Sequence, residues 1–170
     1  MQQIIVRAFD VNRAEITLCD SGKIIDHFNG FIGKNGLTNN KIEGDNKTPI
    51  GTFAINRIFG FAPIKSKMPI IKITDKDVWV DDPESEFYNT LQKRGGNWKS
   101  AENMKIPFYE YGAIIEYNTE NPVPGAGSAM FLHIKEEPTA GCVAVPRDKM
   151  IFINEWLNPA KKPTIKIDAL

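Results

Sequence analysis

Cysteine and histidine are scarce in this chain, which contains only two of each among 170 residues. A small disulfide-stapled scaffold needs more cysteines, so Cys19 and Cys142 do not form such a framework, although the sequence leaves open a single bridge between them. A zinc site needs three or four ligands, and only His27 and His133 could join the two thiols, with no C-x-x-C spacing. A zinc site is therefore disfavoured, and Cys19 and His27 are expected to be surface or packing residues.

Long apolar runs and an excess of one charge are also absent. No run approaches the roughly 20 residues of a transmembrane helix, so we expect no integral membrane association. Lys and Arg number 21, as do Asp and Glu, so nothing in the net charge draws the chain to nucleic acid. The N-terminal segment lacks the charged start and apolar core of a signal peptide. The chain is thus cytoplasmic, trimmed of a leader, or exported without one.

What is present is the composition of an ordinary folded domain. Apolar residues make up 42% and charged residues 25% of the chain, as in globular rather than disordered proteins. A length of 170 residues is enough to bury one hydrophobic core, and no repeat or linker divides it. We therefore predict a single domain spanning residues 1–170.

Alternating apolar and polar residues, separated by turn residues, indicate many short strands. The predicted strands cover residues 14–19, 23–28, 51–55, 78–80, 113–117, 129–134, 142–145 and 164–167. The polar segment 84–105 is expected to be an irregular surface flap with at most one or two helical turns. This pattern predicts a mainly β, β-rich α+β architecture, built as two packed sheets or a distorted barrel.

One helix is expected, late in the chain. Pro146 suits the first helical turn, and Met150, Ile153 and Leu157 then fall on one face. The Asn158-Pro159 step ends the helix because proline cannot continue it.

Cys142 and His133 are the strongest candidates for chemistry. Each alone reads more simply as a packing residue, but only nine positions separate them, across a turn between two predicted strands. Such a turn brings two side chains within hydrogen-bond reach, where an imidazole activates a thiol and carries its proton. Gly141 lets the backbone turn tightly, so that amides near Cys142 point at a developing oxyanion. A catalytic thiol of this kind is expected to have a low pKa.

Residues 125–130, GAGSAM, suggest two other functions that the sequence does not support. The run opens like a dinucleotide-binding loop, but Met130 occupies the position of the third glycine. Ser128 is not in a G-x-S-x-G elbow. We expect Ser128 to satisfy loop backbone groups, with lining of the site as the alternative.

Five segments in the same order resemble the L,D-transpeptidases with a YkuD-type catalytic domain. These segments are KIEGDNKTPIGTF (41–53), VDDPESEFYN (80–89), EYN (116–118), GSAMFLH (127–133) and TAGCVA (139–144). The resemblance covers most of the chain and implies a β-sandwich-like fold of mixed sheets with a cradling helix. It also implies a location in the cell envelope, peptidoglycan stem peptides as partners and no metal or organic cofactor; we expect a monomer.

The resemblance further implies a reaction. Cys142 would attack the carbonyl that joins the third residue of a stem tetrapeptide to its terminal D-alanine, leaving a thioester. His133 would act as base and then as acid, oriented by a backbone carbonyl. An amine from a second stem would form a crosslink, whereas water would make the protein an L,D-carboxypeptidase.

The residues that bind the substrate are less clearly marked. Ala140 and Ala144 stand where many members of the family have a histidine and a polar or basic residue. The charge that holds the donor carboxylate would then come from one of three cations, Lys41, Lys47 or Arg147. Beside the resemblance, the candidate wall residues are Thr139, Asn118, Tyr88 and Asn89, and Ser128 of the GAGSAM loop is the fifth candidate for binding substrate.

Two further functions stay open on sequence alone. One is an antibacterial effector that edits the cell walls of rivals; the missing leader mildly favours it, although trimming of a leader explains the absence equally well. The other is a non-enzymatic β-sandwich that binds wall glycan or peptide and carries an inert thiol. The non-enzymatic alternative predicts no thiolate at neutral pH.

Overall fold

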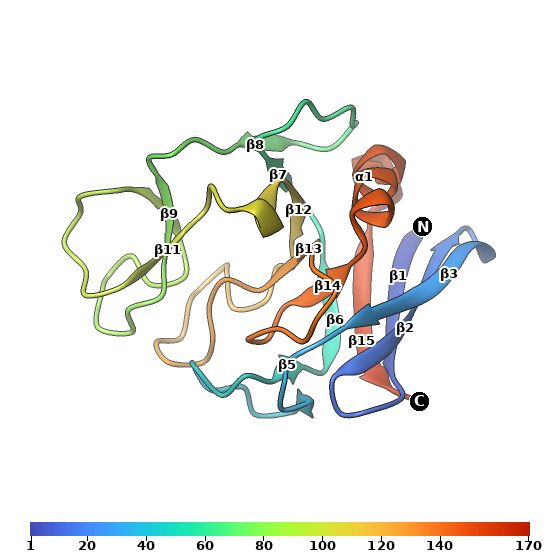
Figure 1. Cartoon of the computed structure of the whole chain (residues 1–170), viewed down its shortest axis with the longest axis horizontal. Coiled ribbons are helices and arrows are strands. Elements are labelled where there is room, and N and C mark those ends of the chain that lie inside the picture. The colour runs from blue at the N-terminus through green and yellow to red at the C-terminus, as the bar shows by residue number, and fades with distance from the viewer.

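A ten-stranded sheet dominates the computed structural model, which describes all residues from 1 to 170. Its strands lie in the order β6 (Gly51–Ala54), β15 (Thr164–Ala169), β1 (Gln2–Ala8), β2 (Arg13–Asp20), β3 (Lys23–Phe31), β14 (Val143–Val145), β13 (Phe131–Ile134), β12 (Tyr111–Ile114), β7 (Ile58–Gly60) and β8 (Ile70–Lys72). The sheet curls strongly, and the two chain termini lie on the side of β1 and β15 (Figure 1). The predicted β-rich, sandwich-like class is confirmed.

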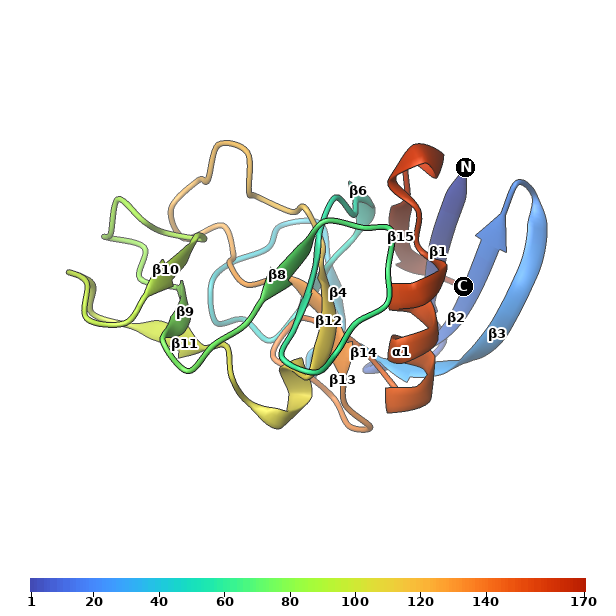
Figure 2. The same cartoon turned by 90° about the horizontal axis from the view of Figure 1, so that it is seen from above.

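Two smaller sheets and three helical segments complete the fold. The three-stranded sheet has the order β10 (Leu91–Lys93), β9 (Asp77–Val80) and β11 (Ala101–Asn103), and β4 (Leu37–Thr38) pairs with β5 (Thr48–Pro49). The helical segments are α1 (Arg147–Trp156) and the short 3₁₀ turns η1 (Pro107–Tyr109) and η2 (Pro159–Lys161). Figure 2 shows the three-stranded sheet at one end of the molecule and the β2–β3 hairpin at the other. No helix has the length and apolarity that crossing a membrane requires.

The late helix is confirmed by α1. Met150, Ile153 and Leu157 are fully buried in the main core, and Pro146 precedes the first helical residue, as the pattern predicts. The apolar face of α1 covers the sheet at β12 and β13 (Figures 1 and 2). Burying such a face stabilises the helix and fixes the strands that carry His133.

A second core cluster fills the space between the two larger sheets. Trp79 on β9 packs edge-on against Phe131 on β13, with ring centroids 5.0 Å apart. Tyr109 packs edge-on against the same Phe131 ring at 5.4 Å. This aromatic cluster packs the three-stranded sheet against β13, the strand that carries His133, and edge-to-face ring pairs add stability beyond the buried area.

Two local predictions were wrong or incomplete. The segment 84–105 consists mostly of turns and bends, as predicted, but it also contains β10 and β11, which pair antiparallel with β9. Strands of only three residues are too short to show alternation, so the sequence hides them. The strand β1 was not predicted, because its first inward position is the polar Gln2, whose side chain donates to Trp156 O at 2.8 Å.

Candidate active site

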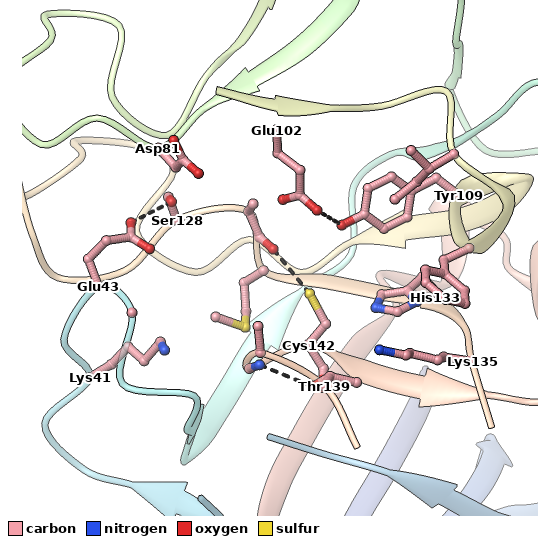
Figure 3. Close-up of a pocket in the computed structure, with 17 residues that line it drawn as sticks. Lys41, Glu43, Asp81, Glu102, Tyr109, Ser128, His133, Lys135, Thr139 and Cys142 are labelled. Carbon is pink, nitrogen blue, oxygen red and sulfur yellow. Dashed lines mark hydrogen bonds between the residues drawn. The ribbon is translucent and has the colours of Figure 1, made fainter. Parts of the chain in front are cut away.

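A cavity of about 430 Å³ lies where the two larger sheets meet. One wall comes from the end of β9, from β11 and from the loop before β5, while the other comes from η1, β13 and the turn before β14. Figure 3 shows Cys142 and His133 on this second wall. The volume is in the usual range for a small-ligand site.

Neighbouring parallel strands bring Cys142 and His133 together. In the ladder of β13 and β14, Leu132 lies opposite Val143 and His133 opposite Ala144. Only eight residues, 135–142, join these strands, whereas parallel neighbours usually need a crossover of about a dozen residues or more. The chain therefore turns back at once, and Cys142 arrives beside the start of β13.

The Cys142 thiol is held by two backbone groups. Its Sγ donates to Ala129 O at 3.1 Å and accepts from the Phe131 N–H at 3.3 Å. Burial is the main cause that raises the pKa of the thiol to about 12, and the charge of Glu102 raises it further. Both cysteines are free, so no bridge joins Cys142 to Cys19.

The His133 ring is fixed in one tautomer. Its Nδ1 lies 3.0 Å from Ile134 O, and a carbonyl can only accept, so Nδ1 carries the proton and Nε2 keeps its lone pair. The ring packs edge-on against Tyr109, with centroids 5.3 Å apart. Burial lowers the pKa of His133 to about 4. A backbone carbonyl thus orients the imidazole, as the resemblance implies.

The expected low pKa of the thiol is contradicted in the unliganded protein. A neighbouring imidazolium would stabilise a thiolate, but burial keeps the His133 imidazole neutral, and the thiol stays protonated. Sequence reasoning missed this because burial cannot be read from a spacing of nine residues. The resting pair is a neutral thiol beside a neutral base.

The turn before Cys142 is tightly hydrogen-bonded. Thr139 Oγ1 accepts from Gly141 N at 3.0 Å and donates to Cys142 O at 2.6 Å. Thr48 Oγ1 donates to Gly141 O at 2.7 Å. These bonds satisfy the N–H and the carbonyl of Gly141 but leave the Cys142 N–H without an acceptor. Of the amides around the thiol, that of Cys142 is free to meet an oxyanion.

Gly141 has a backbone conformation that other residues rarely adopt. Its φ is +144°, and a Cβ there would lie 2.9 Å from Lys47 O. We expect Gly141→Ala to lower the free energy of unfolding by about 1–3 kcal/mol, and to slow acylation of Cys142 by displacing its N–H. Urea unfolding and single-turnover acylation measure the two effects.

Gly95→Ala is the matched control for that substitution, because Gly95 also has a positive φ but has open space where the Cβ would stand. Gly95→Ala should cost some stability and leave acylation unchanged. Equal acylation rates for the two variants would show that the Gly141 turn does not position the site.

The five predicted wall residues divide into two groups. Thr139 and Ser128 line the cavity. The other three lie behind its wall: Asn89 Nδ2 donates to Asn118 O at 2.6 Å, and Tyr88 accepts from the backbone of the 123–127 loop. They hold the loop that carries Ser128, and direct contact with substrate stays a prediction for them.

Of the three cations considered for the donor carboxylate, only Lys41 lines the cavity. Its Nζ is bonded to Asp45 Oδ1 at 2.5 Å and its side chain is almost fully buried. The guanidinium of Arg147 lies outside, in an ion pair with Glu110 at 2.6 Å. Lys47 is not part of the cavity wall.

Sequence reasoning missed five polar residues of the cavity. They are Glu43, Asp81, Glu102, Tyr109 and Lys135. Glu43 and Asp81 fall inside the quoted motif segments, which was the available signal. No sequence signal marked Glu102 and Tyr109, since β11 and η1 were not predicted.

A family model described as the YkuD L,D-transpeptidase catalytic domain matches residues 6–166 of the chain. The match includes every residue that lines the cavity. No curated protein and no solved structure matches the chain.

Proposed function

Because the chain belongs to the YkuD family of L,D-transpeptidase catalytic domains, whose activity is on peptidoglycan, we propose that Cys142 is the nucleophile of a cysteine L,D-transpeptidase. The observation that carries the proposal is the placement of Cys142 and the Nε2 lone pair of His133 on one wall of a single cavity. The acyl donor is a stem tetrapeptide, and the site of action is the cell envelope, where that substrate is found.

Acylation begins from the neutral pair. Sγ of Cys142 attacks the carbonyl carbon before the terminal D-alanine, and its proton passes to Nε2 of His133 in the same step. The thiol need not ionise beforehand, which agrees with the raised pKa of Cys142. The His133 imidazolium then gives its proton to the leaving amine, so that D-alanine departs and a thioester forms.

The negative charge on the carbonyl oxygen needs a donor. The unbonded N–H of Cys142 supplies one, on a turn that Thr139 and Gly141 hold in place before any substrate arrives. A donor fixed in advance stabilises an oxyanion without the cost of reorganisation, and one such donor is worth about 3 kcal/mol in related chemistry.

Two lysines line the cavity, from different sides. Lys41 and Lys135 both line it, and Figure 3 shows Lys135 beside His133 and Lys41 across the cavity. A stem peptide carries carboxylates, which an ammonium group binds as a point charge. Lys41 is the stronger candidate for binding the donor carboxylate, because its side chain is buried and its ion pair with Asp45 fixes its position.

The test is a product analysis with defined substrate. Purified protein is incubated with disaccharide-tetrapeptide, and mass spectrometry follows the products and the mass of the intact protein. We expect free D-alanine, an acyl adduct that maps to Cys142, and crosslinked dimer. Tripeptide without dimer would indicate an L,D-carboxypeptidase instead of a transpeptidase. A protein that forms neither product nor adduct would refute the enzymatic proposal.

A further inference from the structure

The cavity wall formed by the loop before β5, the end of β9 and β11 carries three acidic residues. Glu43, Asp81 and Glu102 all line it, and Figure 3 shows Asp81 and Glu102 on the side of the three-stranded sheet. Ser128 donates to Glu43 at 2.5 Å, and the Tyr109 hydroxyl donates to Glu102. Asp81 accepts no hydrogen bond, although one of its oxygens is fully buried. The hydrogen-bond donors of this wall therefore do not satisfy all of its carboxylate oxygens.

Of the three carboxylates on this wall, Glu102 is the one whose charge acts most on the Cys142 thiol. Its charge raises the pKa of the Cys142 thiol, and among the causes of that shift it comes second to burial. Its carboxylate and the Tyr109 hydroxyl line the same cavity as the sulfur, and Figure 3 shows them bonded to each other. Burial raises the pKa of Glu102 to about 7, which is near the value that suits a proton acceptor at neutral pH. The Tyr109 hydroxyl donates to one oxygen of the Glu102 carboxylate, and the other oxygen accepts no hydrogen bond.

The proton balance of the second half-reaction needs such a group. An alkyl amine reaches the thioester as an ammonium ion with three protons on nitrogen, and the amide product keeps one. One of the other two goes to the leaving sulfur of Cys142 through His133. The last proton needs a second base, whereas water attack needs none, because the acid product releases its own proton.

We propose that Glu102 binds the ammonium group of the acyl acceptor and takes its surplus proton, so that it directs the thioester toward amines rather than water. This inference rests on the proposed function and assigns it an acceptor subsite. The ammonium ion donates to the free oxygen of Glu102, with Asp81 beside it. It loses one proton to Glu102, and its nitrogen forms the bond to the thioester carbon. His133 takes the second proton and passes it to sulfur as the carbon–sulfur bond breaks.

Two small acceptors test the proposal. With disaccharide-tetrapeptide as donor, the protein is offered methylamine, which is an ammonium ion at neutral pH, or hydroxylamine, which is uncharged. The ratio of methylamide to hydrolysed tripeptide should fall by about tenfold or more in Glu102→Gln, because the amide neither attracts the ion nor accepts its proton. The ratio of hydroxamate to tripeptide should stay within about twofold of wild type, since hydroxylamine brings no surplus proton.

Control variants separate this role from a structural one. Glu86→Gln makes the same change of charge at an exposed position in the 84–105 segment, and both ratios should stay at the wild-type value. Glu102→Asp keeps a carboxylate and should recover part of the methylamide. A loss of methylamide and hydroxamate in the same proportion would overturn the proposal.

The wild-type protein offers a second measurement that needs no variant. If Glu102 receives the ammonium ion, the rate of methylamide formation from the thioester rises until Glu102 is ionised, at a pH of about 7, and then levels off. If free amine attacks unaided, the rate keeps rising tenfold per pH unit, and the inference fails. Absence of any thioester on Cys142 would instead refute the proposed function itself.

Discussion

Cys142→Ser is expected to abolish release of D-alanine from disaccharide-tetrapeptide, lowering the rate by about three orders of magnitude or more. A serine hydroxyl is a far weaker acid than a thiol, and the base beside it is weak, because burial lowers the pKa of His133 to about 4. The hydroxyl can still donate to Ala129 O, as the thiol does, so the fold should be retained. Single-turnover release of D-alanine and the intact mass of the protein measure the loss.

Cys19→Ser is the matched control for this change. Cys19 is the only other thiol, and it lies on β2, outside the cavity. Its replacement should leave both the rate and the acyl adduct unchanged. An adduct that persists in Cys142→Ser, or that disappears in Cys19→Ser, would move the nucleophile away from Cys142.

His133→Ala is expected to slow acylation by about 10²- to 10⁴-fold while the protein stays folded, because general base catalysis contributes about that much. Without the imidazole, the thiol has to ionise unaided, and its pKa is about 12. The residual rate should therefore increase with pH throughout the alkaline range. The wild-type rate should instead reach its plateau in the acidic range, above the pKa of His133 at about 4.

Added imidazole provides a further test of the role of His133. The substitution leaves a space between Tyr109 and Phe108, whose rings flank His133 at 5.3 Å and 6.2 Å. Free imidazole in that space should restore part of the acylation rate in His133→Ala and add nothing to the wild type. A variant that is unfolded by circular dichroism would show that His133 is chiefly a packing residue.

The sequence predicted the wall that carries Cys142 and His133 better than the opposite wall. Cys142 and His133 lie close together along the chain, in strands with clear alternation, so their encounter follows from local rules. Glu102 reaches the cavity from β11, a strand of three residues whose existence depends on pairing with β9. No local pattern records such a pairing, because tertiary contacts determine it.

The ionisation of the pair also lay beyond the sequence. The raised pKa of Cys142 and the lowered pKa of His133 both follow mainly from burial. That burial is produced in part by Tyr109, which packs edge-on against the His133 ring. Spacing in the chain identifies which residues meet, but the surrounding residues decide which of them carries a proton.

The position of β15 governs when this protein can finish folding. This strand lies between β1 and β6, pairing Gln3 with Thr164 and Phe53 with Ile165. Until residues 164–169 leave the ribosome, β1 and β6 each present an open edge that can pair with another chain. Assembly of the central sheet is therefore completed only after β15 has been synthesised, and deleting β15 would favour aggregation over a smaller folded domain.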